Sequence, residues 1–433
     1  MVALNKIKQL GKTVTAKTAR KKPAKDVLVV GLDIGTEFVK VLIARVVDNK
    51  LEIIGTGRAH QGLSDMQAGA ISDIAAVVAN CDKALNDAEQ QAGVSPRSAV
   101  IGIAGELVKG TTTTVRARRK NPDKELDITE VERIITLVQK RAEERAKQQL
   151  AWEVGGKEVE IRLVNSALVR IEIDGYPVTN PVGFKGKDVV VQLYTAFAPM
   201  IHIGALERTA QELDLDLLAV AAEPFAVSRS VIGDDASASM SAILMDVGGG
   251  TTDIAVINEG GVQGTKMFGI GGRAFTRSIE RKLSVDFAKA EELKVGLSTN
   301  KTPQAKTPAI EAALKQTLEV WTSGVELALG EFTRLDHLPH KLLLCGGGSS
   351  LDMLMHQLED TDWYKELPFT KRPTVQHIQP GEVVGIVDKT GDVIDHTYIT
   401  AMGLLRVGLD TLQQGDMANA GSIREKIDRM LRV

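Results

Sequence analysis

Apolar residues in the N-terminal part of the chain fall in short runs that glycines and polar residues interrupt. The segment 26–35, DVLVVGLDIG, has the pattern of a buried strand that ends in a glycine turn. Segments 39–47 and 51–59 continue this pattern, so we expect a meander of three strands. In segment 71–93 the apolar residues recur at helical spacing, and the segment closes with Gly93, a residue typical of helix C-caps.

A self-contained block of alternating patterns follows. Segment 98–105 has the pattern of a strand, and segment 127–149 has apolar residues on one helical face. Segments 158–171 and 188–197 again have the pattern of strands. The order strand, helix, strand, strand predicts a small α+β subdomain, at about residues 96–198, inserted into a larger domain.

The second half of the chain again alternates strands and helices after a polar stretch at 233–241. We expect a strand–loop–strand unit at 242–257 and a strand, KLLLC, that ends in GGGSSL. Helices are expected at 272–283, 308–334 and 398–412. The pattern predicts two α/β lobes, at 27–232 and at 241–412, the second with a returning C-terminal helix.

Composition excludes several classes of protein. The chain has 433 residues, of which 43% are hydrophobic and 25% charged, which is enough for a large core and at least two domains. The net charge of −3 gives no argument for a nucleic-acid partner, and we expect none. The two cysteines, Cys81 and Cys345, lie far apart, so we expect a reduced compartment without a disulfide framework.

Both ends differ from the body in composition. Residues 1–26 are rich in lysine, which predicts a solvated basic arm or a contact with anionic lipid rather than a signal peptide. After a linker at 413–420, residues 421–433 form an amphipathic helical pattern. We expect this helix to lie in a membrane interface, the alternative being a helix packed on its own protein. The residues expected at the membrane are Ile423, Arg424, Lys426, Ile427, Arg429, Met430 and Leu431.

Two segments share one order of residue types: a strand, an aspartate, a glycine turn with a hydroxyl, and a second strand. They are GLDIGTEFVKV (31–41) and MDVGGGTTDIAV (245–256), with Asp33 and Asp246 at matching positions. A structural unit repeated in this way indicates two related lobes.

The chemistry of the two turns fits a phosphate site. Glycines allow backbone N–H groups to approach an anion, and the threonines beside them add hydroxyl donors. Asp33 and Asp246 end their strands, so we expect them to face each other across a cleft and to hold Mg²⁺, partly through water. The chain has neither the P-loop motif nor the Rossmann glycine fingerprint.

With the third glycine loop, CGGGSS (345–350), the two turns resemble the nucleotide motifs of the actin-like ATPase superfamily. That resemblance implies a two-lobed, RNase H-like α/β fold that binds ATP (or ADP) and Mg²⁺ between its lobes. The resemblance also places Glu291 and Lys294 near the ribose or adenine of the nucleotide. The alternative for these two residues is an i, i+3 pair on the surface. The residues implied to lie at the nucleotide are Asp33, Gly35, Thr36, Asp246, Gly248, Gly249, Gly250, Thr251, Thr252, Gly271, Gly272, Glu291, Lys294, Gly346, Gly347 and Gly348.

Within the superfamily, the chain resembles the FtsA cell-division family. The inserted block before EPFA (223–226), the segment 180–194 and the layout of 260–294 carry this resemblance. The PilM family of pilus-assembly proteins shares the inserted block, and the C-terminal segment favours FtsA. A small-molecule kinase is a third alternative, although the sequence has no signature of a sugar pocket. The basic arm and the short linker depart from the FtsA pattern.

The FtsA resemblance implies an adaptor on the cytoplasmic face of the membrane. Such a protein binds ATP, self-associates into filaments and tethers the tubulin-like protein FtsZ through the C-terminal peptide of FtsZ. A PilM-like protein would instead bind a PilN peptide. We expect at most weak ATPase activity. Glu207, in a segment that resembles an MreB helix, is the candidate to orient water, and an ordinary surface glutamate is the alternative.

Overall fold

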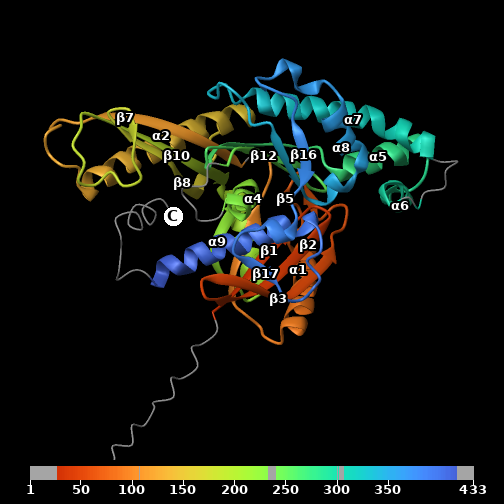
Figure 1. The fold of residues 1–433 in the computed structure, drawn as a ribbon. Coiled ribbons are helices and arrows are strands. Elements are labelled where there is room, and N and C mark those ends of the chain that lie inside the picture. Colours follow the sequence, from red (N-terminus) through yellow and green to blue (C-terminus); the bar gives the residue numbers. More distant parts are fainter. Residues whose placement is uncertain (1–26, 107, 233–239, 300, 302–306, 417–433) are drawn as a thin grey trace, which may run out of the picture.

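The computed structural model describes residues 27–106, 108–232, 240–299, 301 and 307–416. Its elements form two lobes with an insert at the side (Figure 1). In Figure 1 the first lobe lies at the bottom, the second lobe at the upper right and the insert at the upper left. The two-lobed α/β architecture expected from the sequence is confirmed.

A six-stranded sheet forms the first lobe, in the order β11-β6-β1-β2-β3-β17. Antiparallel pairing of β1 with β2 and of β2 with β3 confirms the expected meander. Strands β6, β11 and β17 pair in parallel with their neighbours. The strands are β1 (Leu28–Ile34), β2 (Phe38–Val47), β3 (Lys50–His60), β6 (Ser98–Ile103), β11 (Asp216–Ala222) and β17 (Ile386–Asp388).

Helix α1 (Ile74–Ala92) packs on this sheet against β2 and β3. It begins after the N-cap Asp73 and ends at Gly93, whose φ of 67° is the left-handed C-cap predicted from the sequence. Gly57 of β3 allows the close approach, because a Cβ built there would lie 1.8 Å from the carbonyl oxygen of Ala84. A side chain at this position would push the helix off the sheet.

The second lobe holds five strands of a nine-stranded sheet, whose order is β16-β15-β12-β13-β14-β7-β10-β8-β9. Its strands are β12 (Ala242–Val247), β13 (Thr252–Asn258), β14 (Gly261–Phe268), β15 (Lys341–Cys345) and β16 (Thr374–His377). Its helices are α5 (Gly272–Leu283), α6 (Phe287–Ser298), α7 (Thr307–Gly330) and α8 (Asp352–Asp360). The sequence pattern did not predict α6 as a separate helix.

The insert supplies the other four strands of that sheet. Its elements are β7 (Lys109–Arg118), α2 (Ile128–Glu153), β8 (Ile161–Ile173), β9 (Tyr176–Pro177) and β10 (Asp188–Pro199). Strand β7 meets β14 of the second lobe through the pair Gly264 and Thr111.

One expected strand lies elsewhere. We expected segment 98–105 to begin the insert, but β6 pairs with β1 and β11 in the first lobe, and β7 is the first strand of the insert. A short apolar run suits the centre of either sheet, and its long-range partners decide between them.

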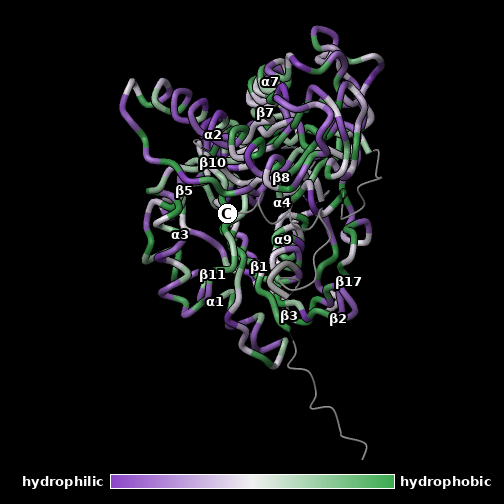
Figure 2. Tube along the Cα trace, turned by 90° about the vertical axis from the view of Figure 1, so that its left-hand side faces the viewer, coloured by the Kyte–Doolittle hydropathy of each residue, from purple (hydrophilic) through white to green (hydrophobic). Residues whose placement is uncertain are grey.

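Two helices lie between the sheets. They are α4 (Glu223–Ile232) and α9 (Ile399–Asp416); α9 contacts β1, and α4 contacts β12 and β13. A buried cluster that includes Val29, Leu244 and Leu405 joins both lobes here. Figure 2 shows hydrophobic residues concentrated on the central strands and helices and hydrophilic residues on the periphery. Helix α3 (Met200–Glu212) leads from the insert back to the first lobe.

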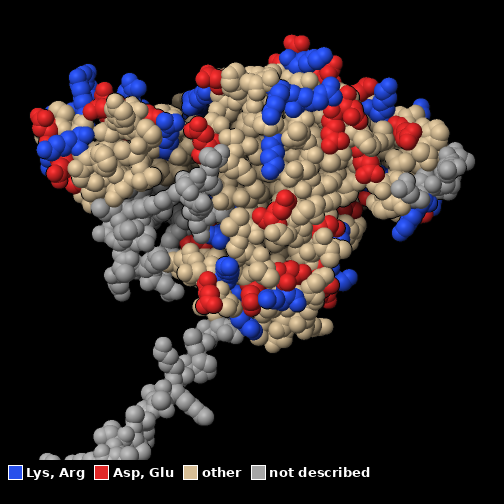
Figure 3. Space-filling view, viewed as in Figure 1, with Lys and Arg blue, Asp and Glu red and all other residues tan. Residues whose placement is uncertain are grey.

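Within the described residues, no helix is long and apolar enough to cross a membrane. Figure 3 shows acidic and basic side chains interspersed on the face that it draws. The expected basic arm at 1–26, part of the linker and the expected membrane helix at 421–433 lie outside the described residues.

Candidate functional site

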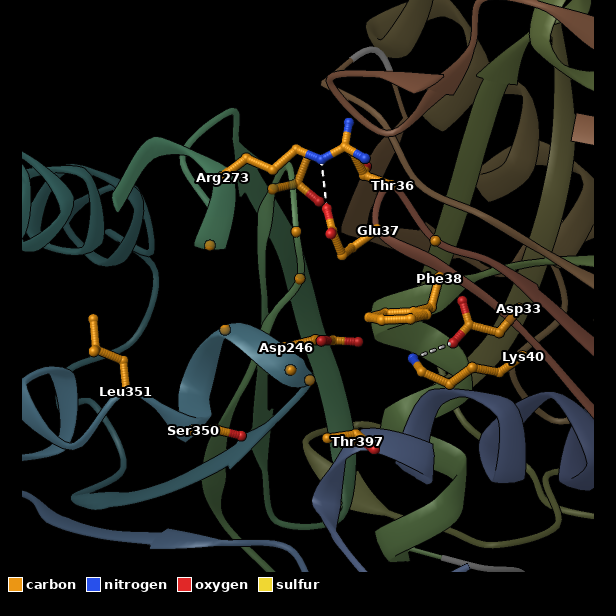
Figure 4. Close-up of a pocket in the computed structure, with 18 of the residues that line it drawn as sticks. Asp33, Thr36, Glu37, Phe38, Lys40, Asp246, Arg273, Ser350, Leu351 and Thr397 are labelled. Atoms are coloured by element: carbon orange, nitrogen blue, oxygen red, sulfur yellow. Dashed lines mark hydrogen bonds and ion pairs between the residues drawn. The ribbon is translucent and has the colours of Figure 1, made fainter. Parts of the chain in front are cut away.

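A cavity of about 490 Å³ lies between the two lobes. Most of the residues expected at the nucleotide line it, and Figure 4 shows several of them with their side chains. The expected residues that line the cavity are Asp33, Gly35, Thr36, Asp246, Gly248, Gly249, Thr251, Gly272, Glu291, Lys294, Gly346, Gly347 and Gly348.

The first turn joins β1 to β2. The Gly35 N–H donates to the carbonyl oxygen of Phe38 over 3.1 Å, which closes the turn. A Cβ on Gly35 would lie 2.7 Å from that same oxygen, so a side chain there would disturb the turn. Thr36 follows with only 7% of its surface exposed.

The second turn joins β12 to β13 and contacts the first one. The Gly248 N–H donates to the carbonyl oxygen of Thr251 over 2.9 Å. A Cβ on Gly250 would lie 2.7 Å from Oγ1 of Thr36, and a Cβ on Gly249 would lie 2.8 Å from Cβ of Glu37. The two repeated turns, far apart in sequence, therefore meet at the cavity.

The third glycine loop packs on the end of β12. Gly346 has a φ of 81°, and a Cβ there would lie 2.1 Å from Oδ1 of Asp246. The loop continues as a 3₁₀ turn, η1 (Gly347–Ser350). Beneath it, the rings of His377 and His396 stack with centroids 3.9 Å apart, and Nε2 of His396 contacts the Ser350 hydroxyl at 3.0 Å.

The pair Glu291 and Lys294 lies on α6, at the second-lobe side of the cavity. Their carboxylate and ammonium groups are 2.8 Å apart, at the i, i+3 spacing. Lys294 also donates to the carbonyl oxygen of Gly272 over 3.0 Å and to the hydroxyl of Thr276 over 2.8 Å. The pair is therefore anchored to the start of α5 and exposed to the cavity.

Four expected residues do not line the cavity. Gly250 packs on the first turn, Gly271 is the N-cap of α5, and the Thr252 hydroxyl donates to the carbonyl oxygen of Ile270 over 2.7 Å. Glu207 lies on α3, half exposed, in an ion pair of 2.8 Å with Arg162 of the insert. The structure therefore does not bring Glu207 to the cleft.

The cavity contains a buried group of charges, Asp33, Lys40, Glu223, Asp246 and Asp253, of which the sequence reading missed three. Nζ of Lys40 donates to Oδ2 of Asp33 over 3.0 Å. Burial lowers the pKa of Lys40, but the carboxylates of Asp33 and Asp246 raise it by more, so the lysine stays charged. Figure 4 shows this pair on one side of Phe38 and Asp246 on the other.

The remaining acids are held away from water. Burial, and then the charges of Asp33, Asp253 and Asp246, raise the pKa of Glu223 well above its usual value. Burial, and then Asp246, raise the pKa of Asp253 in the same way. Among the described residues, Oδ1 of Asp253 is buried without a hydrogen-bond partner. Such a concentration of acids at strand ends suits a bound cation.

The sequence held weak signals for the missed residues. Lys40 is a lysine inside an apolar strand, Asp253 closes the repeated motif, and Glu223 precedes a first-turn proline. None of these signals shows which side of its element faces a cavity.

Comparisons with known proteins agree with this geometry. A family model described as Cell division protein FtsA matches residues 243–403. The chain is 26% identical to cell division protein FtsA of Pseudomonas aeruginosa over 424 residues, which cover 91% of this chain and 93% of that protein. It is 25% identical to the Bacillus subtilis FtsA over 359 residues, 77% of this chain and 76% of that one.

A solved structure described as a PilM-PilN type IV pilus biogenesis complex has a similar fold. The TM-score is 0.63 at 17% identity, over 88% of this chain and 98% of that chain. These matches and the two lobes around one cleft identify the chain as a relative of the FtsA cell division proteins, with the actin-like fold.

Proposed function

We propose that the cleft binds ATP, or ADP, together with Mg²⁺. The observation that carries this proposal is that two repeated turns and a third glycine loop, far apart in sequence, line one cavity between the lobes. Its volume of about 490 Å³ is within the range of small-molecule sites. The turns of the two lobes would hold the phosphates, and the loop at Gly346–Gly348 with the Glu291–Lys294 pair would hold the nucleoside.

The residues present fit a Mg²⁺ ion. Asp33 and Asp246 would hold it partly through water, because the described residues contain no group of three or more side chains arranged to ligate a metal. Mg²⁺ commonly keeps several waters and takes further ligands from phosphate oxygens. The unpartnered Oδ1 of Asp253 is a further acceptor for such a water. When bound, the ion supplies positive charge to the phosphates.

If the chain hydrolyses ATP, Glu223 is better placed than Glu207 to orient the attacking water. Glu223 lines the cleft, and burial with the neighbouring acids raises its pKa, which makes its carboxylate a stronger base than that of an ordinary glutamate. A steady-state ATPase assay compares the wild type with Glu223→Gln and Glu207→Ala. We expect Glu223→Gln to lower the rate about 100-fold or more and Glu207→Ala to leave it unchanged. A loss of activity only in Glu207→Ala would reverse this assignment.

At the level of the cell, we propose that the chain acts in division as a membrane adaptor that self-associates and binds an FtsZ-like C-terminal peptide. Its relatives among the FtsA cell division proteins support this role. The C-terminal pattern at 421–433 would supply the membrane contact. Each basic residue near an anionic surface contributes only about 1 kcal/mol. One copy should therefore exchange on and off, and filaments would bind more firmly through effective concentration.

Two binding assays test the adaptor proposal. In co-sedimentation with anionic vesicles, we expect the wild type to pellet and a chain without residues 421–433 to stay in solution. In a pull-down, we expect an FtsZ C-terminal peptide to retain the chain and a PilN N-terminal peptide not to. Retention by the PilN peptide alone would favour the PilM-like alternative, for which the fold similarity is the support.

A further inference from the structure

An ion pair joins the two lobes at the rim of the cleft. Glu37 comes from the turn between β1 and β2, and Arg273 comes from the first turn of α5. Nε of Arg273 donates to Oε2 of Glu37 over 2.6 Å. In Figure 4 this bond is the dashed line on the opposite side of the cavity from Thr397. We call these two residues the clasp.

The clasp is largely removed from water. The side chain of Arg273 is 11% exposed and that of Glu37 18%. Arg273 also donates from Nη1 to the carbonyl oxygen of Leu63 over 3.3 Å and from Nη2 to that of Gly62 over 3.4 Å. His60 contacts the other carboxylate oxygen of Glu37 at 2.8 Å. A charge-assisted bond in such a site is stronger than the same bond on an open surface.

The clasp is continuous with the two turns that line the cleft. Glu37 directly follows Thr36, and the backbone of Gly249 packs against the Cβ of Glu37. The backbone N–H of Arg273 donates to the carbonyl oxygen of Gly249 over 2.8 Å. The clasp therefore fixes the distance between the turns of the first and second lobes.

On the opposite side of the cavity, the lobes are joined through α9. The hydroxyl of Thr400, at the start of this helix, donates to Asp246 at the end of β12. Helices α4 and α9 fill the space between the two sheets there. A rotation of the lobes about this packed side would widen the cleft at its rim, and the clasp bond would have to break first.

We propose that the clasp controls nucleotide exchange: it opens for a nucleoside phosphate to reach or leave the cavity, and it closes again over the bound molecule. This inference rests on the proposed nucleotide binding. It makes Glu37 and Arg273 positioning residues, which act by holding the two turns together. Removing either side chain of the clasp should therefore speed the release of nucleotide.

The experiment measures the release of a fluorescent N-methylanthraniloyl ATP from the full chain with Mg²⁺, chased by excess ATP in a stopped-flow instrument. We expect Glu37→Gln and Arg273→Gln each to raise the release rate by about fivefold or more. The double variant should release no faster than Arg273→Gln alone, because that change already removes the bond that Glu37→Gln weakens. Glu37→Gln also distinguishes the effect of the clasp from direct binding of phosphate by Arg273, because it leaves the Arg273 side chain in place.

The matched control is Arg277→Gln on the same helix. Arg277 is 55% exposed, pairs with Glu280 at 3.6 Å and does not line the cleft, so the release rate should stay at the wild-type value. Wild-type release rates in both clasp variants would overturn the proposed role of the clasp and would leave the proposal of nucleotide binding intact. Faster release in Arg273→Gln alone would also overturn the proposal, because the bond between Glu37 and Arg273 would then not be what retains the nucleotide.

A second measurement does not depend on nucleotide. Hydrogen exchange of the nucleotide-free protein reports opening of the turn at 248–251 and of the first turn of α5. Faster exchange there in both clasp variants, with Arg277→Gln unchanged, would support the clasp even if the wild type bound no nucleotide. Unchanged exchange in both clasp variants would overturn it.

Discussion

At the scale of single residues, the cleft brings together several buried acids that do not stabilise the fold. Asp246, Asp253 and Glu223 all lie within the protein, and burial raises the pKa of each. Lys40 offsets part of this charge through its bond to Asp33. Buried carboxylates that destabilise the empty protein are typical of sites that meet a cation or a reacting group. Their presence in the cleft is therefore better explained by binding than by folding.

Replacing Glu223 by Gln should stabilise the nucleotide-free protein at pH 7. The pKa of Glu223 in the folded chain lies well above its unfolded value, so stability falls as pH rises through the interval between them. Gln removes this cost while keeping the size of the side chain. We expect a melting temperature higher by about 2 °C or more, with a smaller gain at pH 5. Differential scanning calorimetry at both pH values measures this, and a lower melting temperature at pH 7 would contradict it.

At the scale of elements, the glycines of the third loop are not equivalent. Gly346 has positive φ and faces Asp246, whereas a Cβ on Gly347 would meet nothing within 4 Å. The sequence shows only three glycines in a row. Which of them the backbone requires depends on β12, the strand that packs beneath the loop.

Gly346→Ala should destabilise the chain by at least about 1 kcal/mol, because the new methyl group would collide with Asp246 and the backbone would be strained. Gly347→Ala is the matched control and should leave the free energy of unfolding within about 0.5 kcal/mol of the wild type. Urea unfolding followed by circular dichroism measures both. Equal midpoints for the two variants would show that the loop geometry described above is wrong.

The stacked pair His377 and His396 links the third loop to the start of α9. Burial, and then the neighbouring His377, lower the pKa of His396 to about 4. Because the unfolded histidine binds its proton near pH 6.5, the free energy of unfolding should fall as pH decreases from about 6.5 to 4. His396→Gln should remove this part of the loss. Denaturant titrations at pH 7 and pH 5 test it, and an identical pH dependence in the variant would count against this effect of the stacked pair.

Most elements and the repeated turns could be predicted from local pattern, because period and turn chemistry are local properties. The sheet to which β6 belongs could not, since an apolar run of this kind fits either sheet. Lys40, Glu223 and Asp253 were missed because their role depends on which lobe faces them. The clasp joins residues 236 positions apart, and nothing in the local pattern of either residue indicates the other.

At the scale of the whole molecule, two lobes meet through similar turns. The lobes are joined by α4 and α9 on one side of the cavity and by the clasp on the other. A bound molecule that contacts both turns would favour the closed arrangement. Nucleotide would in this way control the shape that the chain presents to a second copy or to a partner.

The central claim is that both lobes bind one Mg²⁺–ATP in this cleft. Isothermal titration calorimetry of the full chain with Mg²⁺–ATP tests it most directly, with Asp246→Asn as the comparison. The account predicts one site per chain in the wild type and an affinity at least about tenfold lower in Asp246→Asn. No binding to the folded wild type, or equal affinity in the variant, would contradict it.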